Sequence, residues 1–324
     1  MFRYSLRLLA VLALLALPTA APAAPAAAQT GYPITVVDDS GVSATFASPP
    51  QRIVSLNPGY TEIMFALGAG GRVVAVDTYS DYPPEAAAVK TRLNVYPSPS
   101  VEAIVGLKPD LVLSLVESDQ TVSQLRQQKI PVLKLFPRDF DATVGTITRL
   151  GQVVAASDRA EAITSGMVAR RDAVVAAVAD APRPAVYEEL DASDPSKPFV
   201  AGPNGFYGQL IDLAGGDNVF GDLPADFGQV GAESVIERNP DVILLTDADL
   251  PLNPQTPELV AARPGWDAIA AVQSGAIHAV KGRLVSTPGP RLIDGLEAVA
   301  AVLHPDRFPS GGAAAPRPLA LAAP

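Results

Sequence analysis

The sequence predicts an α/β protein with two Rossmann-like lobes joined by a long, rigid α-helix, on the basis of three observations. Alternating strand and helix patterns occupy two separate parts of the chain, and a helical pattern without strands lies between them. A phrase that begins at Val101 (VEAIVGLKPDLVLSL) also returns from Ala232 (AESVIERNPDVILLT). In both copies a Glu stands seven residues before a Pro-Asp pair that opens an apolar run. This repeat indicates two lobes with the same order of helices and strands.

The first 28 residues have the pattern of a secretory signal peptide. Arg3 and Arg7 precede an apolar run over residues 8–17, and small residues follow up to Ala28. That run is shorter than the ~20 residues of a membrane span. We therefore expect a periplasmic or extracytoplasmic protein exported by its signal peptide. The sequence contains no cysteine, so we expect no lipid-anchor cysteine.

In the first lobe, each element follows from a short pattern. Residues 34–46 read as a hairpin, and the β-branched runs at 52–56 and 73–77 read as strands. Residues 61–69 have helical spacing, and the glycines that follow are typical of a helix C-cap. The first copy of the repeated phrase then supplies helix, turn and strand. One more helix and strand complete the lobe (122–130, 131–136).

Between the lobes, residues 141–181 lack strand signals but carry periodic apolar residues. Ser157 is the expected N-cap of a helix of roughly 24 residues, about 36 Å long. The second lobe then repeats the alternation: strand 185–190, helix 206–215, the second phrase, helix 266–275 and strand 276–280. The predicted parts are the signal peptide 1–28, the N-terminal lobe 29–150, the linking helix 151–182, the C-terminal lobe 183–309 and a disordered tail 310–324.

Catalytic chemistry finds little support in the composition. Without cysteine and with only His278 and His304, thiolate catalysis and cysteine-ligated metal sites are excluded. We expect structural roles for both histidines, no catalytic residues and no metal site, although carboxylates alone could bind a hard cation. Asp247 and Asp249 could form a carboxylate pair, but an exposed turn is favoured. An α/β enzyme using Asp81 or Asp247 as acid or base is the alternative class, and no second catalytic group accompanies them.

The loops expected at the carboxyl ends of the strands are more informative, because open α/β sheets bind ligands there. Aromatic residues make up only 6% of the chain, yet several stand in these loops. Flat side chains near a cleft suit a large, planar, partly apolar ligand, with packing against neighbouring prolines as the structural alternative. The candidate residues are Asn57, Tyr60, Tyr79, Asp81, Tyr82, Tyr96 and Phe227. The net charge of -10 argues against nucleic acid as a partner.

From residue 52 to 307 the chain resembles the periplasmic binding proteins of ABC importers for cobalamin, iron siderophores and haem. The segment TYSDYPPEA, which contains Tyr79, is most similar to the cobalamin-binding members. The resemblance implies a ligand cleft between the lobes, no enzymatic activity and no intrinsic cofactor. It also implies a monomer that captures cobalamin (vitamin B12) or a related corrinoid and delivers it to the permease dimer of an ABC importer.

The resemblance also assigns roles to particular residues. Glu102 and Glu233 match the acidic residue at the tip of each lobe that docks onto permease arginines; favourable placement at a helix N-terminus is the structural alternative. Tyr96 and Phe227 stand where cobalamin binders often carry tryptophan, and Phe199 matches an aromatic lining position. Arg283 departs from the acidic residue of close cobalamin binders. It favours a ferric siderophore or haem as the alternative ligand.

Overall fold

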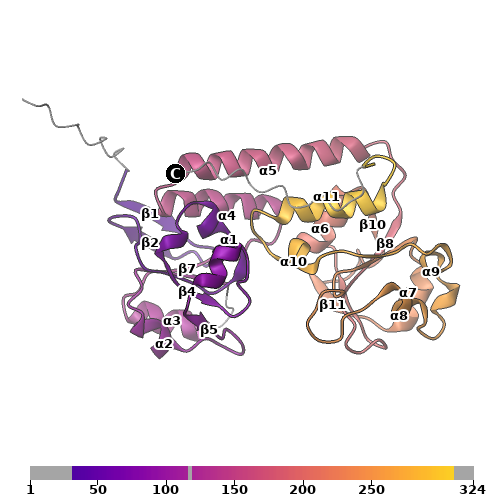
Figure 1. The fold of residues 1–324 in the computed structure, drawn as a ribbon, viewed down its shortest axis with the longest axis horizontal. Coiled ribbons are helices and arrows are strands. Elements are labelled where there is room, and N and C mark those ends of the chain that lie inside the picture. Colours follow the sequence, from indigo (N-terminus) through magenta and orange to yellow (C-terminus); the bar gives the residue numbers. More distant parts are fainter. Residues whose placement is uncertain (1–30, 116–118, 310–324) are drawn as a thin grey trace, which may run out of the picture. The chain divides into compact units, whose positions relative to one another are not determined.

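The computed structural model describes residues 31–115 and 119–309, and Figure 1 shows the arrangement of their helices and strands. The predicted signal peptide and tail lie outside these residues. Within the two described ranges, no helix has the length and hydropathy required to cross a membrane. The predicted hairpin is confirmed, since β1 (Ile34–Val37) and β2 (Ser43–Phe46) pair antiparallel.

The N-terminal lobe is built on a five-stranded sheet in the order β5-β4-β3-β6-β7. All of its neighbouring strands run parallel, as the alternation of strands and helices predicts. Its central strands are buried apolar runs, which is typical of parallel sheets covered on both faces. The strands are β3 (Ile53–Ser55), β4 (Val73–Asp77), β5 (Arg92–Leu93), β6 (Leu111–Ser114) and β7 (Val132–Lys134). The helices are α1 (Pro58–Ala66), α2 (Val101–Gly106) and α3 (Asp119–Gln127), with short turns η1 (Gly70–Arg72) and η2 (Pro84–Ala88).

Helix α1 follows the first strand of this sheet directly, and local chemistry fixes both of its ends. The Asn57 side chain accepts a hydrogen bond from the Gly59 backbone N–H at 2.8 Å, which caps the N-terminus. After the C-cap Leu67, Gly68 has a φ of 77°, a left-handed conformation that glycine adopts without steric cost. The predicted C-cap is therefore confirmed.

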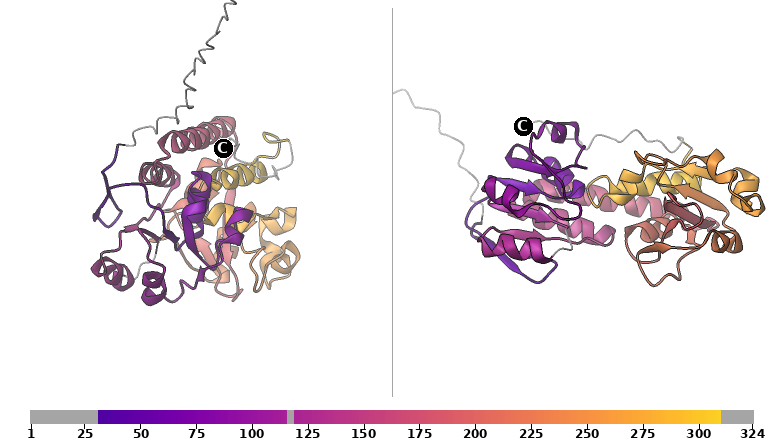
Figure 2. Two further views of the ribbon diagram at one scale, coloured as in Figure 1. Left: turned by 60° about the vertical axis from the view of Figure 1, so that its left-hand side comes forward. Right: turned by 90° about the horizontal axis from the view of Figure 1, so that it is seen from below.

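The predicted linking helix is α5 (Ser157–Val178), which lies beside α4 (Phe140–Val153) and α11 (Leu292–Leu303). Figure 1 shows α5 running alongside both of them, with α4 beside one part of α5 and α11 beside the other, and Figure 2 gives two further views. Arg170 of α5 joins α5 to α11 through ion pairs with Asp294 at 2.6 Å and Glu297 at 2.7 Å. The predicted N-cap was wrong by one residue: Ala156 is the cap and Ser157 is the first helical residue.

The C-terminal lobe has a mixed sheet in the order β11-β9-β8-β12-β13, with β10 also paired to β8. Strands β8, β12 and β13 are parallel, whereas β9 pairs antiparallel with β8 and β11. The strands are β8 (Ala185–Asp191), β9 (Phe199–Ala201), β10 (Asp217–Asn218), β11 (Phe227–Gln229), β12 (Val242–Leu245) and β13 (Ile277–Ala279). The helices are α6 (Phe206–Leu213), α7 (Ala232–Arg238), α8 (Pro257–Ala261), α9 (Ala270–Ser274) and α10 (Gly282–Ser286).

One predicted helix of this lobe is divided. Residues 266–275 form the short turn η3 (Trp266–Ala268) and then α9, because Ile269 between them has an extended backbone. The Trp266 side chain is buried and packs edge-on against Tyr187 of β8. Trp266 is therefore a core residue of this lobe.

The repeated phrase forms the same unit in both lobes: a short helix, a turn and a strand, α2-β6 in one and α7-β12 in the other. The turn is made alike in each, since Lys108 and Asn239 both have positive φ angles of 49° and 44°. Each of these residues precedes the Pro of its Pro-Asp pair, and a residue before proline is driven out of the helical region. The sequence echo therefore corresponds to a structural repeat.

Candidate functional site

A cavity of about 890 Å³ is lined by both lobes. Its walls are loops that follow strands β3, β4 and β5 in the N-terminal lobe and β8, β12 and β13 in the C-terminal lobe. These are carboxyl ends of strands, where open α/β sheets bind ligands. The predicted ligand cleft between the lobes is therefore confirmed.

The N-terminal wall carries Tyr79 and Asp81 on a loop that is held in place by Asp77. The buried Asp77 carboxylate accepts hydrogen bonds from the Tyr79 backbone N–H at 2.7 Å and from the Ser80 hydroxyl. Burial raises the pKa of Asp77, and these hydrogen bonds oppose that shift. Arg92 adds a hydrogen bond to the Ser80 carbonyl at 2.9 Å. The loop therefore presents Tyr79, which is about half exposed, from a fixed backbone.

Arg283 reaches across the cavity from α10 to this loop. Its Nη1 donates to the Tyr79 carbonyl at 2.9 Å, and its Nη2 lies 3.7 Å from Asp81 Oδ2. The predicted residues Tyr79, Asp81 and Arg283 are thus brought together. Among the described contacts, the only ion pair of Arg283 is the one with Asp81. The Arg283 guanidinium is therefore not an unpaired positive charge in the cavity.

The cavity wall is acidic. Asp77, Asp81, Asp191 and Asp249 line it, and Arg283 is the one basic residue among the described lining residues. The Asp191 carboxylate caps its own loop by accepting from the Ser193 backbone N–H at 2.7 Å. The surplus of carboxylates gives the cavity a negative field, which favours neutral or cationic ligands.

The structure places two predicted site residues differently. Asn57 lines the cavity, but its side chain is committed to capping α1. Tyr60 is fully buried, and its hydroxyl donates to the Leu135 carbonyl. The prediction that Tyr60 contacts the ligand was wrong, because the third residue of α1 faces the core between helix and sheet.

Tyr82 is also turned away from this cavity. It lines a separate cavity of about 340 Å³, where the Arg291 guanidinium stacks 3.6 Å from the centre of its ring. Arg291 also forms a buried ion pair with Glu62 of α1 at 2.5 Å. Tyr82 therefore lies outside the candidate cavity, where its cation–π contact joins its loop to the start of α11 and the Glu62 ion pair joins α1 to the same arginine.

Tyr96, Phe199 and Phe227 are exposed, but none of them lines the cavity itself. Phe227 pairs directly with Ala201, two residues from Phe199. Because alternate residues of a strand share a face, both phenyl rings project from the same face of β9 and β11. Their role as ligand contacts, and that of Tyr96, stays a prediction.

The two glutamates predicted to dock the permease hold equivalent positions. Glu102 and Glu233 are the second residues of α2 and α7, and both are exposed. Ser100 caps α2 and its hydroxyl donates to Glu102 at 3.1 Å, whereas Gly231 precedes α7 without a side-chain cap. Two exposed carboxylates thus occupy the same site on the two copies of the repeat.

Sequence reasoning missed a buried polar cluster behind the C-terminal wall. Arg263 donates to both carboxylate oxygens of Glu189, at 2.6 and 2.7 Å, and to Gln255 at 2.9 Å. Asp247 lies beside this cluster and is fully buried, so the expectation of an exposed turn was wrong for Asp247 although Asp249 is exposed. Burial and the Glu189 charge raise the pKa of Asp247 to about 7.

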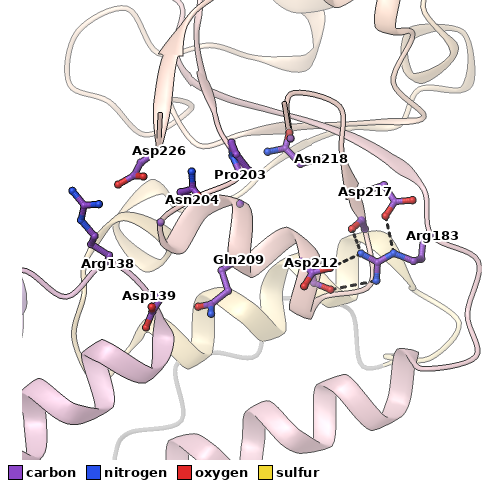
Figure 3. Close-up of a pocket in the computed structure, with 14 residues that line it drawn as sticks. Arg138, Asp139, Arg183, Pro203, Asn204, Gln209, Asp212, Asp217, Asn218 and Asp226 are labelled. Carbon is purple, nitrogen blue, oxygen red and sulfur yellow. Dashed lines mark hydrogen bonds and ion pairs between the residues drawn. The ribbon is translucent and has the colours of Figure 1, made fainter. Parts of the chain in front are cut away.

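A further cavity of about 580 Å³ lies between α6 and the start of α4. Figure 3 shows Arg183 held between Asp212 and Asp217, with ion pairs of 2.7 Å to each. The side-chain Oε1 of Gln209 accepts from the Phe140 backbone N–H at 2.7 Å, which joins the two lobes. None of the predicted site residues lines this cavity, so it is not the candidate site.

The residues that the structure describes contain no candidate metal site. No cluster there contains three or more His, Asp or Glu side chains placed to hold a metal ion. Of the two histidines, His278 lies in β13 as predicted, and burial lowers its pKa. His304 is buried, with its Nε2 3.3 Å from the Gly215 carbonyl.

Two relatives share most of the chain. The uncharacterized ABC transporter substrate-binding lipoprotein YvrC of Bacillus subtilis is 30% identical over 86% of this chain and 87% of its own length. The cobalamin-binding protein of Halobacterium salinarum is 31% identical over 84% of this chain and 74% of its own length. The first of these is named a lipoprotein, whereas this sequence contains no cysteine.

Solved structures with the same fold are named for different ligands. The vitamin B12-binding protein BtuF of Vibrio cholerae matches with a TM-score of 0.68 and 25% identity, over 79% of this chain and 97% of its own. The haem-binding protein RhuT of a Roseiflexus species matches with a TM-score of 0.70 and 28% identity, over 80% and 99%. The family described as periplasmic binding protein matches residues 53–284. The chain therefore belongs to the periplasmic binding protein family, whose members are solute-binding transport proteins rather than enzymes.

Proposed function

We propose that this protein binds cobalamin or a related corrinoid in the cavity between its lobes and delivers it to an ABC importer. The observation that carries this choice of ligand is the acidic lining of the cavity, in which the one basic residue is paired with Asp81. A corrinoid holds cobalt(III) in a macrocycle with neutral amide side chains, and cyanocobalamin, its phosphodiester included, is neutral overall, so it brings no net negative charge into this field. The cobalamin-binding relative supports the same choice.

The second candidate is an anionic iron complex, either haem or a ferric siderophore, and Arg283 is the observation that favours it. A guanidinium can bind a carboxylate or catecholate oxygen in a bidentate manner. To do so, Arg283 would have to exchange the Tyr79 carbonyl and Asp81 for the ligand. The remaining carboxylates of the wall would then repel the rest of an anionic ligand.

Calorimetric titration of the protein from Gln29 onward tests both candidates. The titrants are cyanocobalamin, dicyanocobinamide, haem and a ferric catecholate complex. One-to-one binding of the corrinoids, with weak or absent binding of the two anionic complexes, supports the proposal. Tight binding of haem or the ferric complex without corrinoid binding overturns it in favour of iron uptake.

An Arg283→Met variant separates the candidates further. If the ligand is a corrinoid, loss of the guanidinium changes its affinity by less than about threefold, since the charge is already paired. If the ligand is anionic, the variant loses at least about tenfold, because a direct charged hydrogen bond is removed. Arg92→Met is not a suitable control, as Arg92 supports the Tyr79 loop. Arg238→Met, at an exposed ion pair on α7, is the matched control.

We also infer that Glu102 and Glu233 dock onto the permease and that the protein is exported without a lipid anchor and acts as a monomer. Their equivalent, exposed positions on the two copies of the repeat support the docking role. Two carboxylates on separate lobes can engage symmetry-related cationic sites, which fixes the orientation of the complex. Mass spectrometry of the exported protein tests cleavage after Ala28 and the absence of a lipid.

A further inference from the structure

The loop after β12 forms part of the cavity wall that the sequence did not indicate. Asp249, Leu250, Pro251 and Leu252 all line the cavity. Leu252 is 77% exposed, which is high for a large apolar side chain. A single exposed leucine is ordinary on a protein surface, but one that lines a ligand cavity is placed to contact an apolar part of the ligand.

Buried contacts fix the start of this loop. The fully buried Asp247 accepts a hydrogen bond from the Ala192 backbone N–H at 3.1 Å, and the Asp247 carbonyl accepts from the Leu250 N–H at 3.2 Å. Asp249 then accepts from the Gly282 N–H at 3.2 Å, which ties the loop to α10. A side chain at Gly282 would stand only 2.2 Å from the Thr246 carbonyl, so this close approach requires glycine.

The far end of the loop is fixed by the cluster of Glu189, Gln255 and Arg263. Gln255 is buried, and its side chain spans the junction: the amide nitrogen donates to the Asn253 carbonyl at 3.0 Å, and the amide oxygen accepts from Arg263 at 2.9 Å. Arg263 is in turn held by both oxygens of Glu189. A buried network whose members are satisfied specifies one geometry.

Leu252 therefore lies on a loop that is anchored at both ends. Because the loop is already ordered, a ligand that contacts Leu252 loses little binding free energy to the conformational entropy of the loop. Its side chain has only apolar atoms to offer, and the prolines at 251 and 254 on either side add no backbone N–H donors. The surface that this loop presents to the cavity is thus hydrocarbon beside the carboxylate of Asp249.

We propose that Leu252 is a specificity-determining contact for an apolar, uncharged edge of the ligand, and that Gln255, which is held by Arg263, positions it through the hydrogen bond to the Asn253 carbonyl. This inference rests on the proposed function for the place of the ligand, but it does not depend on which macrocycle is bound. The methyl-bearing rim of a corrin ring is the edge that the proposed function would supply.

The test titrates Leu252→Ser with cyanocobalamin, dicyanocobinamide, haem and the ferric catecholate complex, beside the wild type. The matched control is Leu259→Ser, another exposed leucine, which lies on α8 and does not line the cavity. Whichever titrant binds the wild type should bind Leu252→Ser about tenfold more weakly, the size expected for a lost apolar contact. Leu259→Ser should bind as the wild type does.

The positioning role of Gln255 requires a second set of variants. Gln255→Ala should weaken binding in the wild-type background but have no further effect in Leu252→Ser. Gln255→Glu keeps the acceptor for Arg263 but loses the donor to the Asn253 carbonyl, so it should weaken binding as Gln255→Ala does. Additive losses would overturn the positioning role.

The outcomes separate this inference from the proposed function. Haem binding that depends on Leu252 would overturn the corrinoid proposal and uphold the loop contact. Corrinoid binding that is unchanged in Leu252→Ser would support the corrinoid proposal and overturn the contact with Leu252. If none of the four titrants binds the wild type, both proposals fall.

Discussion

Asp110 and Asp241 perform the same task in the two lobes: each carboxylate accepts hydrogen bonds from the backbone at the start of the strand next to its own. Asp110 accepts from the N–H groups of Gln51 and Arg52, both at 2.7 Å. Asp241 accepts from the N–H of Ala185 at 2.9 Å. The Pro-Asp pair of the repeated phrase therefore joins β6 to β3 and β12 to β8, which gives the repetition a physical reason.

These contacts predict unequal costs for the two substitutions. Asp110→Ala removes two charge-assisted hydrogen bonds and should lower the free energy of unfolding by about 1.5–3 kcal/mol. Asp241→Ala removes one and should cost about half as much. Urea midpoints followed by circular dichroism measure both, with the exposed Asp267→Ala as the control. Equal losses, or none, would show that the carboxylates do not clamp the strands.

Tyr79 and Tyr82 stand in one short segment but should behave differently. Tyr79→Ala removes an exposed ring from the cavity wall and should weaken corrinoid binding by about tenfold, with little change in stability. Tyr82→Ala removes the ring beneath Arg291 and should cost about 1–2 kcal/mol of unfolding free energy while the dissociation constant stays the same. Titration and thermal unfolding of both variants decide this; a binding defect confined to Tyr82→Ala would contradict it.

The docking glutamates should act on transport and not on ligand binding. Glu102→Gln and Glu233→Gln should each weaken the apparent affinity for the importer by at least about tenfold, because a carboxylate–guanidinium pair loses its charge. The measurement is ligand-stimulated ATP hydrolysis by the reconstituted importer, alongside titration of the free protein. Glu237→Gln is the matched control, since Glu237 is an exposed residue of α7 outside its first turn. Normal stimulation by both variants would leave the glutamates with a helix-capping role alone.

Glu188 predicts a pH dependence of stability. Its carboxyl is buried in β8, and burial raises its pKa from 4.5 to about 8. Between these values the unfolded chain has lost the proton that the folded state retains, so this group's contribution to stability falls as pH rises from about 4.5 to about 8. Glu188→Gln should unfold like the wild type at pH 4.5 and be more stable at pH 8.5 by on the order of a few kcal/mol.

Urea titrations of the wild type and Glu188→Gln at the two pH values provide the measurement. Glu161→Gln, at an exposed residue of α5, serves as the control. Its difference from the wild type in unfolding free energy should be the same at both pH values. Asp247 adds a similar slope in both proteins, because its pKa is also raised, to about 7. A Glu188→Gln difference that does not grow with pH would mean that the buried carboxyl is already ionised.

The sequence predicted the parallel strands and the linking helix well, because buried strands and long helices leave strong periodic signals. It did not predict that β9 pairs antiparallel with β8 and that β11 pairs antiparallel with β9. Each of these two strands has three residues, too few for a pattern. It also placed one helix over residues 266–275, where the extended Ile269 divides it. Tertiary packing decides such short elements.

The candidate site was predicted in outline but not in the direction of each side chain. Tyr60 was assigned to the ligand because of its loop, yet its position in the first turn of α1 turns it into the core. Asp247 was expected at the surface because a carboxylate is costly to bury, and Arg263, whose charge acts on it in the fold, is 16 residues away in sequence. Leu252 was overlooked because nothing local marks an apolar residue in a proline-rich loop as part of a cavity.

The largest hydrophobic cluster contains buried residues of the N-terminal sheet, of α4 and α5, and of the C-terminal lobe, such as Ile53, Leu150, Met167 and Leu296. The described residues from 32 onward, 32–115 and 119–309, accordingly belong to one compact unit. Two sheets that share one interior are thermodynamically a single body: neither half has a complete set of neighbours when expressed alone. The chain should therefore melt in one calorimetric transition whose enthalpy reports the whole protein, and a ligand held at either wall stabilises both sheets together.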